Sequence, residues 1–165
     1  MTPANAALYD AFDSLEGLAL DMMVQNLFAG TVVIALTVII HTFGLILVTR
    51  VMAWMTARYR MHGRRSRVLA MITVVFGLFA IMTVEVWLWA VAYILTGSFD
   101  HFDTALYFST VTFSTLGYGD VLPHPEWRLF TSLEGVNGFL LIGWSTAYLV
   151  AAGTRIGPFK TGEHF

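Results

Sequence analysis

The residues with the most distinctive chemistry lie in one short segment, residues 115–120, whose sequence is Thr-Leu-Gly-Tyr-Gly-Asp. Gly117 and Gly119 alternate with larger residues, and glycine adopts positive φ values at little steric cost. Such backbone geometry lets successive carbonyl groups point the same way, whereas an ordinary strand alternates them. A row of carbonyl oxygens can replace the hydration shell of a cation. The pattern therefore predicts a binding site for dehydrated cations.

The side chains of this segment add to that prediction. The Thr115 hydroxyl group can serve as a further oxygen ligand at one end, and the Asp120 carboxylate stands where cations would arrive at the other. Tyr118 would point away from the ions and brace the segment against neighbouring helices. A short helix that ends near Ser114 would direct its partially negative carboxyl terminus toward a cation.

Three apolar stretches are long enough to hold this segment in a membrane. They cover residues 27–48, 68–95 and 129–152, and each exceeds the roughly 20 residues that a helix needs to cross about 30 Å of hydrocarbon. Hydrophobic residues make up 57% of the chain and charged residues 12%, against about 25% charged in ordinary soluble domains. The composition predicts an all-α membrane protein with three transmembrane helices and leaves little room for a soluble domain.

The stretch between the second and third spans predicts a pore loop. Residues 103–114 form a moderately apolar run that is too short to cross the bilayer, and the extended residues 115–120 follow it. Non-helical backbone at membrane depth must line a water-filled path, because lipid cannot satisfy its hydrogen bonds. A span, a half-helix, an extended segment and a second span, in this order, are the layout of a pore loop with its flanking helices.

The distribution of charge predicts an orientation. The linker 49–67 contains six arginines and no acidic residue, whereas the N-terminal segment 1–26 is acidic and has no Lys or Arg. By the positive-inside rule, the linker and the tail 153–165 are expected in the cytoplasm and the N-terminus outside a plasma (inner) membrane. Residues 6–20 predict a short amphipathic helix that lies on the outer membrane surface or packs on the protein's own outer face.

The arginines of the linker are expected to fix the topology and to bind anionic lipid headgroups. A voltage sensor would need arginines within a spanning helix, and the three spans contain neither Arg nor Lys. The arginines expected at the headgroups are Arg58, Arg60, Arg64, Arg65 and Arg67.

Residues 115–120 resemble the selectivity filter of the potassium channels, usually written T-V-G-Y-G-D. The aromatic-rich residues 105–109 resemble the pore helix of that family, and Pro123 with Trp127 resembles its connection from filter to inner helix. The resemblance implies a pore domain over residues 68–152. Its parts would be an outer helix 68–95, a pore helix 103–114, a filter 115–120 and an inner helix 129–152.

The resemblance also implies the ligands and the assembly. Permeant K⁺ would be the bound ion, without an organic cofactor, and a homotetramer would form because one pore loop supplies a quarter of the ring. The first span, 27–48, has no counterpart in the resemblance. The expected filter residues are Thr115, Leu116, Gly117, Tyr118 and Gly119, with K⁺ at the carbonyl groups of the first four and at the Thr115 hydroxyl group.

The sequence departs from the family pattern at three places. Leu116 stands where valine is usual. Val111 stands where some members carry a glutamate that bonds to the filter aspartate, here Asp120. We expect Glu134 to replace that brace by bonding to Thr112, Ser114 or a backbone amide, with a proton sensor as the alternative.

The third departure concerns the inner helix, whose usual hinge glycine would fall at Phe139. The nearest candidates for a gating hinge are Gly138 and Gly143. Close helix packing, which also explains Gly135, is the alternative for all of these glycines.

Other polar residues lie in or near the spans. His41 is expected to bond to a neighbouring helix, although pairing with Glu85 looks awkward because their depths, counted from the ends of the apolar runs, differ by about 10 Å. Asn137 faces a cavity or bonds to backbone. His101 and His124 flank the outer mouth and could titrate near neutral pH.

Three other functions compete with a potassium channel. A weakly selective cation channel would predict a disrupted filter, and a non-conducting scaffold subunit would not need a filter. An enzyme is not expected, because the spans carry no acid–base pair, metal-ligand cluster or nucleophile with a partner histidine. No phosphate-binding loop or nucleic-acid patch is present in the sequence.

Overall fold

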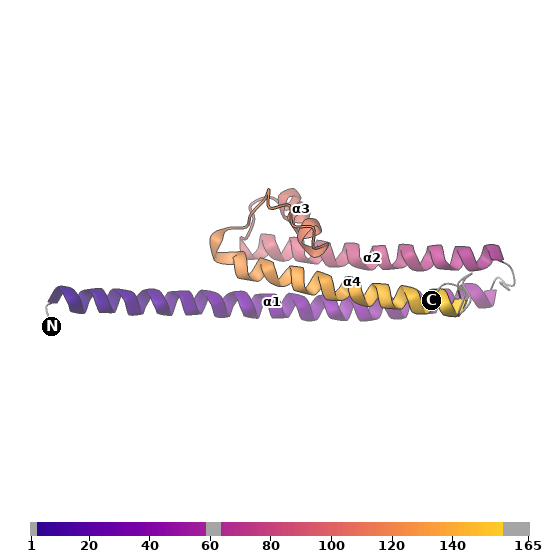
Figure 1. The fold of residues 1–165 in the computed structure, drawn as a ribbon, viewed down its shortest axis with the longest axis horizontal. Helices are drawn as coiled ribbons and strands as arrows, with labels where there is room; N and C mark the ends of the chain where they lie inside the picture. The colour runs from indigo at the N-terminus through magenta and orange to yellow at the C-terminus, as the bar shows by residue number, and fades with distance from the viewer. Residues whose placement is uncertain (1–2, 59–63, 157–165) are drawn as a thin grey trace.

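The computed structural model describes residues 3–58 and 64–156, with the side chains of residues 15–55, 57–58 and 67–155. All regular structure in these residues is helical. The elements, in chain order, are α1 (Pro3–Arg58), α2 (Arg64–Thr96), α3 (Phe102–Phe113), the single 3₁₀ turn η1 (Pro125–Trp127) and α4 (Arg128–Ile156) (Figure 1).

Three helices are long and apolar enough to cross a membrane, as the sequence predicted. They cover Leu15–Met55 of α1, Arg67–Thr96 of α2 and Pro125–Arg155, which is mainly α4. The stretch in α1 has 41 residues, or about 60 Å at 1.5 Å per residue, twice the thickness of the hydrocarbon core. The N-terminal part of α1 extends beyond the bundle that α1 forms with α2 and α4 (Figure 1).

The expectation of a separate short helix before the first span was wrong. One helix of 56 residues, α1, runs through the expected boundaries at residues 26 and 48. No proline follows Pro3 in this helix, and isolated glycines such as Gly17 and Gly30 cost only about 1 kcal/mol each relative to alanine, which is too little to end a long helix. Residues 59–63, between α1 and α2, lie outside the described residues.

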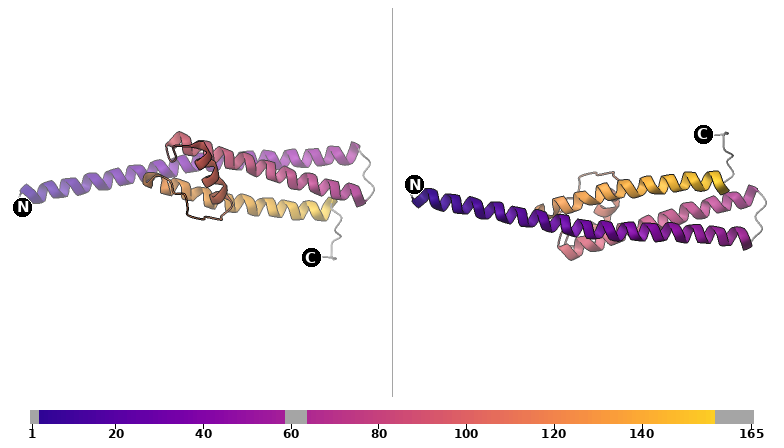
Figure 2. Two further views of the ribbon diagram at one scale, coloured as in Figure 1. Left: turned by 90° about the horizontal axis from the view of Figure 1, so that it is seen from above. Right: turned by 90° about the horizontal axis from the view of Figure 1, so that it is seen from below.

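The three long helices pack side by side, and α3 lies across α2 and α4 near the end at which α4 begins (Figure 2). Small residues permit this close packing. Gly30 of α1 lies against Leu133 of α4, and Gly44 of α1 lies against Ile81 of α2. α1 therefore contacts both helices that flank α3.

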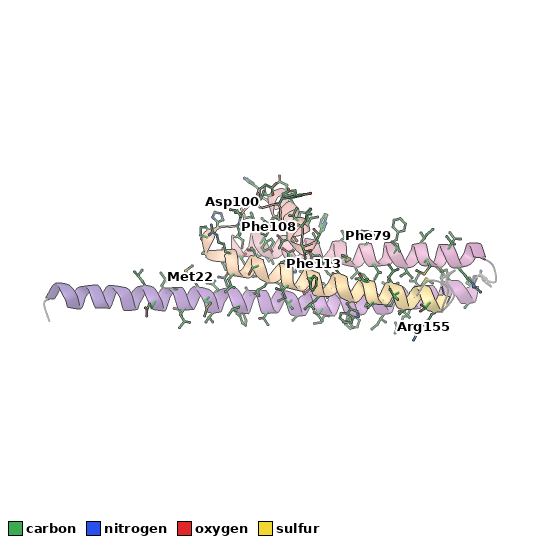
Figure 3. The ribbon with its side chains drawn as sticks, in the orientation of Figure 1. Met22, Phe79, Asp100, Phe108, Phe113 and Arg155 are labelled. Atoms are coloured by element: carbon green, nitrogen blue, oxygen red, sulfur yellow. The ribbon has the colours of Figure 1, made fainter. Side chains whose placement is uncertain are left out.

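Aromatic rings form the core around α3. Tyr93 of α2 contacts Phe99, Phe108 and Phe130, with ring centroids 5.6 Å apart in each pair. Phe113, at the end of α3, is buried in the same cluster (Figure 3). These contacts fix α3 on the C-terminal end of α2 and the N-terminal end of α4.

Candidate functional site

The short helix α3 positions the segment that the sequence singled out. α3 has 12 residues, about 18 Å at 1.5 Å per residue, and so is too short to cross a membrane. Its bounds lie within one residue of the predicted range 103–114. Its buried face carries Ala105, Ser109, Val111 and Phe113, so α3 is held against α2 and α4 along its length.

The backbone after α3 has an alternating geometry. Positive φ values occur at Thr115 (61°), Gly117 (56°) and Gly119 (73°), whereas Leu116 and Tyr118 have none. Alternation between positive and negative φ turns successive peptide groups to the same side. The positive φ of the glycines was predicted. That of Thr115 was missed, because a β-branched residue rarely adopts it.

Backbone hydrogen bonds hold this segment against the end of α3. The amides of Leu116 and Gly117 both donate to the Val111 carbonyl, at 3.0 and 3.2 Å, and the Thr115 amide donates to the Thr112 carbonyl at 3.0 Å. The Ser114 hydroxyl group also donates to the Val111 carbonyl. These bonds satisfy carbonyl groups that the end of a helix leaves without partners.

Every residue from 114 to 120 is exposed on the single chain. The exposed fraction is 55% for Leu116 and 67% for Tyr118. The bracing of Tyr118 against a helix, expected from the sequence, is therefore not provided within this chain.

Asp120 has a partner that the sequence did not reveal. The Tyr107 hydroxyl group donates to its Oδ2 atom at 2.7 Å, and this hydrogen bond to the carboxylate raises the pKa of Tyr107 above its ordinary value. Tyr107 lies one turn before Val111 on α3, the position at which a glutamate brace is absent. The signal that could have found it was a hydroxyl-bearing aromatic residue on α3, 13 residues before the carboxylate.

Glu134 lies behind α3 and is fully buried. Its carboxyl group contacts the Ser109 hydroxyl group at 2.5 Å and accepts a hydrogen bond from the Tyr93 hydroxyl group. The expected partners, Thr112, Ser114 or a backbone amide, were wrong: Glu134 bonds instead to Ser109 of α3 and Tyr93 of α2. Ser109 is on the buried face of α3, whereas Ser114 bonds back to its own helix.

The Ser109 hydroxyl group also lies 2.9 Å from the Val86 carbonyl. A serine hydroxyl group has one proton to donate. When Ser109 donates it to Val86, the contact with Glu134 requires a proton on the carboxyl group. The cluster then links α2, α3 and α4 without a buried charge.

α1 holds α4 through two buried amide side chains. Asn26 donates to the Glu126 carbonyl at 2.9 Å and accepts from the Phe130 amide at 2.8 Å. Asn137 of α4 donates to the Thr37 hydroxyl group of α1 at 2.9 Å. Both expectations for Asn137, a cavity and a backbone bond, were wrong, because α1 packs directly over this residue.

His41 of α1 and Glu85 of α2 are paired, with Nδ1 and Oε1 2.9 Å apart and both side chains fully buried. The Trp144 ring packs on His41 with the centroids 5.1 Å apart. The expectation that their depths would not match was wrong. It was counted from the ends of the apolar runs, whereas α1 continues as a helix to Arg58 and α2 begins at Arg64.

The structure distinguishes the two glycines of α4 that the sequence offered as a gating hinge. A Cβ atom at Gly138 would lie 2.8 Å from the Phe113 Cα atom, whereas Gly143 has open space around it. Close packing thus accounts for Gly138, while the hinge role of Gly143 stays a prediction.

His124, one of the two histidines expected at the outer mouth, lies 3.5 Å from the Asp100 carboxylate, and both side chains are exposed.

The linker arginines are described only in part. Arg58 and Arg67 are exposed at the ends of α1 and α2. Arg60 and the tail residues 157–165 lie outside the described residues, as do the side chains of Arg64 and Arg65. Among the described residues, no group of three or more His, Cys, Asp or Glu side chains could hold a metal ion.

Spanning helices with a short helix and a segment of alternating φ between the last two define a multi-pass membrane protein of the channel class. Residues 79–155 match the family model described as an ion channel. The match runs from the middle of α2 to the end of α4 and leaves out α1. The protein is an ion channel that conducts passively and is not an enzyme. No curated protein and no solved structure matches the chain.

Proposed function

We propose that the chain is the subunit of a potassium-selective channel in which four copies surround a central pore. The observation that carries this proposal is the alternation of positive φ at Thr115, Gly117 and Gly119 in an exposed segment directly after α3. Aligned carbonyl groups are what a filter needs to replace the hydration shell of K⁺.

In this arrangement the carbonyl groups of residues 115–118 and the Thr115 hydroxyl group coordinate K⁺. The carboxyl end of α3 points toward the ions, where its partial negative charge favours a cation. Asp120, held by Tyr107 at 2.7 Å, stands at the outer mouth. The Glu134 cluster fixes α3 from behind, because it joins α3 to α2 and α4.

The exposure of residues 114–120 argues for neighbouring subunits. Backbone groups of an irregular segment cannot face lipid, because lipid offers them no hydrogen-bond partners. They must therefore face other protein or a water-filled path. α4 carries a second exposed stripe below the segment, suited to the pore axis and the adjacent subunit. Its members are Val136, Phe139, Leu140, Gly143 and Ala147.

The proposed orientation follows the positive-inside rule. The connection between α1 and α2 would lie in the cytoplasm, and the start of α1 and the filter mouth outside a plasma (inner) membrane. α1 then serves as an outer support that binds α4 through Asn26 and Asn137 and α2 through His41.

The test is flux of K⁺ and Na⁺ into liposomes that contain the purified chain. A Gly119→Asp variant should be silent, because a side chain cannot easily adopt the φ of 73°. Gly17→Asp, the same change at an exposed glycine of α1 with open space around it, is the matched control and should conduct.

Flux of K⁺ without Na⁺ in the wild type and the control, and none in Gly119→Asp, is the expected result. Equal flux of both ions would favour the weakly selective channel and would point to Leu116. An intact tetramer that passes neither ion, with or without anionic lipid, would contradict the proposal.

A further inference from the structure

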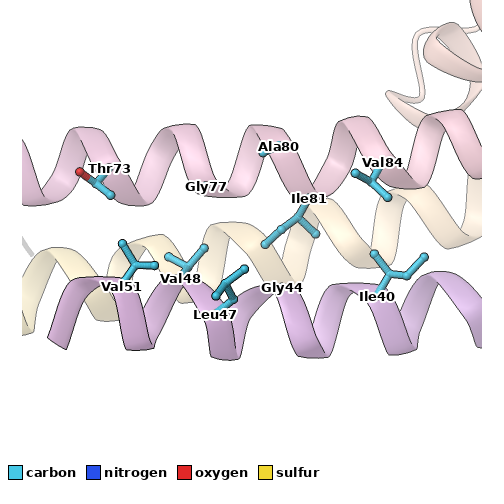
Figure 4. A pocket seen from close by; sticks show the side chains of 10 residues that line it. All are labelled: Ile40, Gly44, Leu47, Val48, Val51, Thr73, Gly77, Ala80, Ile81 and Val84. Carbon is cyan, nitrogen blue, oxygen red and sulfur yellow. The ribbon is translucent and has the colours of Figure 1, made fainter. Parts of the chain in front are cut away.

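α1 and α2 enclose an apolar groove, with α4 behind them in Figure 4. Its volume is about 360 Å³. Gly44 and Gly77 let the two helices approach closely at its base, where Ile81 packs on Gly44 and Val48 packs on Gly77. The lining residues are Ile40, Gly44, Leu47, Val48 and Val51 of α1 and Thr73, Gly77, Ala80, Ile81 and Val84 of α2.

The groove offers no free polar group. The hydroxyl group of Thr73, its one polar lining side chain, donates to the Leu69 carbonyl of its own helix at 3.0 Å. Leu47 and Val84 are 62% and 52% exposed, so the groove is open to whatever surrounds the helices. Along a helix that spans a membrane, the surrounding medium is hydrocarbon.

The length of the groove matches one leaflet. From Ile40 to Val51 it runs about 16 Å at 1.5 Å per residue, and half of the hydrocarbon core is about 15 Å thick. Its end at Val51 and Thr73 points toward the connection between α1 and α2. A hydrocarbon chain in the groove would thus carry its polar end to that connection.

The connection has the charge that an anionic headgroup requires. Residues 49–67 contain six arginines and no acidic residue. Arg58 and Arg67 are exposed at this end of α1 and α2. Clusters of arginine next to a spanning helix attract anionic lipid, so charge selects the headgroup and the groove selects the chain.

We propose that the groove between α1 and α2 binds one acyl chain of an anionic phospholipid whose headgroup contacts Arg58 and Arg67. This site does not depend on the ion selectivity of the pore. It assigns a bound ligand to α1, which lies outside the family match.

The experiment is native mass spectrometry of the purified full chain in detergent. The probes are dioleoyl phosphatidylglycerol, dioleoyl phosphatidylcholine and dihexanoyl phosphatidylglycerol, which has the headgroup without long chains. Ala80→Phe fills the groove from an exposed position, and Thr83→Phe, on an exposed residue outside the groove, is its matched control. A double variant, Arg58→Gln with Arg67→Gln, removes the charge, and Arg155→Gln on α4 is its control.

We expect the wild type to retain dioleoyl phosphatidylglycerol over both other lipids. Ala80→Phe should lose this retention and Thr83→Phe should keep it. The double arginine variant should lose the preference for phosphatidylglycerol over phosphatidylcholine, and Arg155→Gln should keep it.

Unchanged retention in Ala80→Phe would overturn the proposal. A change in oligomeric mass with unchanged lipid retention would do the same and would make the groove a contact between copies. Equal retention of dihexanoyl and dioleoyl phosphatidylglycerol would also overturn it, because the acyl chain would then not matter. If Ala80→Phe does not fold, Val84→Phe at the other end of the groove tests the same outcomes.

Discussion

The buried Glu134 cluster gives the sharpest prediction. Glu134→Gln keeps the shape of the side chain, and its amide can accept from Tyr93 and donate to Ser109 while Ser109 donates to the Val86 carbonyl. Every hydrogen bond of a protonated carboxyl group is then kept. The second N–H group of the amide gains no partner, so we expect the free energy of unfolding to fall by about 1 kcal/mol per chain.

Glu134→Ala removes the acceptor of the Tyr93 hydroxyl group, which is fully buried. A buried donor without a partner costs about 1–3 kcal/mol, and each lost buried methylene group adds about 0.8 kcal/mol. We therefore expect a loss of about 2–4 kcal/mol per chain. Glu126→Ala, the same change on an exposed side chain just before α4, should have little effect.

The assay is thermal unfolding of the purified protein in detergent, followed by tryptophan fluorescence, with K⁺ flux into liposomes measured across neutral pH. Equal destabilisation by Gln and Ala would refute the proton count at Ser109, because the cluster would then need a charged carboxylate. A Gln variant of normal stability that loses a pH response of the wild-type flux would favour the proton-sensor alternative over the structural brace.

Two other substitutions test the packing of α4. Asn26→Ala leaves the buried Phe130 amide without an acceptor, so we expect a loss of about 1–3 kcal/mol and faster hydrogen exchange at that amide; unchanged exchange would contradict the contact. Gly138→Ala forces a Cβ atom against the Phe113 backbone and should cost about 1–3 kcal/mol. Gly17→Ala, at an exposed glycine of α1 with open space around it, should be neutral or stabilising in thermal unfolding; equal losses in the two would refute the packing argument.

Features that depend on local sequence could be predicted. Uninterrupted apolar runs predicted the three spans, because the membrane thickness sets the length of a spanning helix. The short run before residue 115 predicted α3 to within one residue at each end. The alternating glycines predicted positive φ at Gly117 and Gly119, because few other residues adopt it.

Contacts between helices could not be predicted in the same way. The pairing of His41 with Glu85 depends on how far each helix continues past its apolar run. The arginine-containing linker does not follow the apolar pattern, so the length of this continuation could not be predicted from it. The partners of Glu134 depend on which face of α3 is buried. Asn26 has partners 100 and 104 residues further along the chain, so only the rotation of each helix about its axis brings them together.

The continuity of α1 has a mechanical consequence. Asn26 and Arg58 lie on one unbroken helix. The residue that bonds to the first turn of α4 and the end of α1 that carries Arg58 therefore belong to one rigid element. Their separation is about 48 Å at 1.5 Å per residue, more than the whole hydrocarbon core. A push along the axis of α1 at one membrane face must therefore either break the bonds of Asn26 or move the start of α4 at the opposite face. The two faces of the membrane are thus joined through one element.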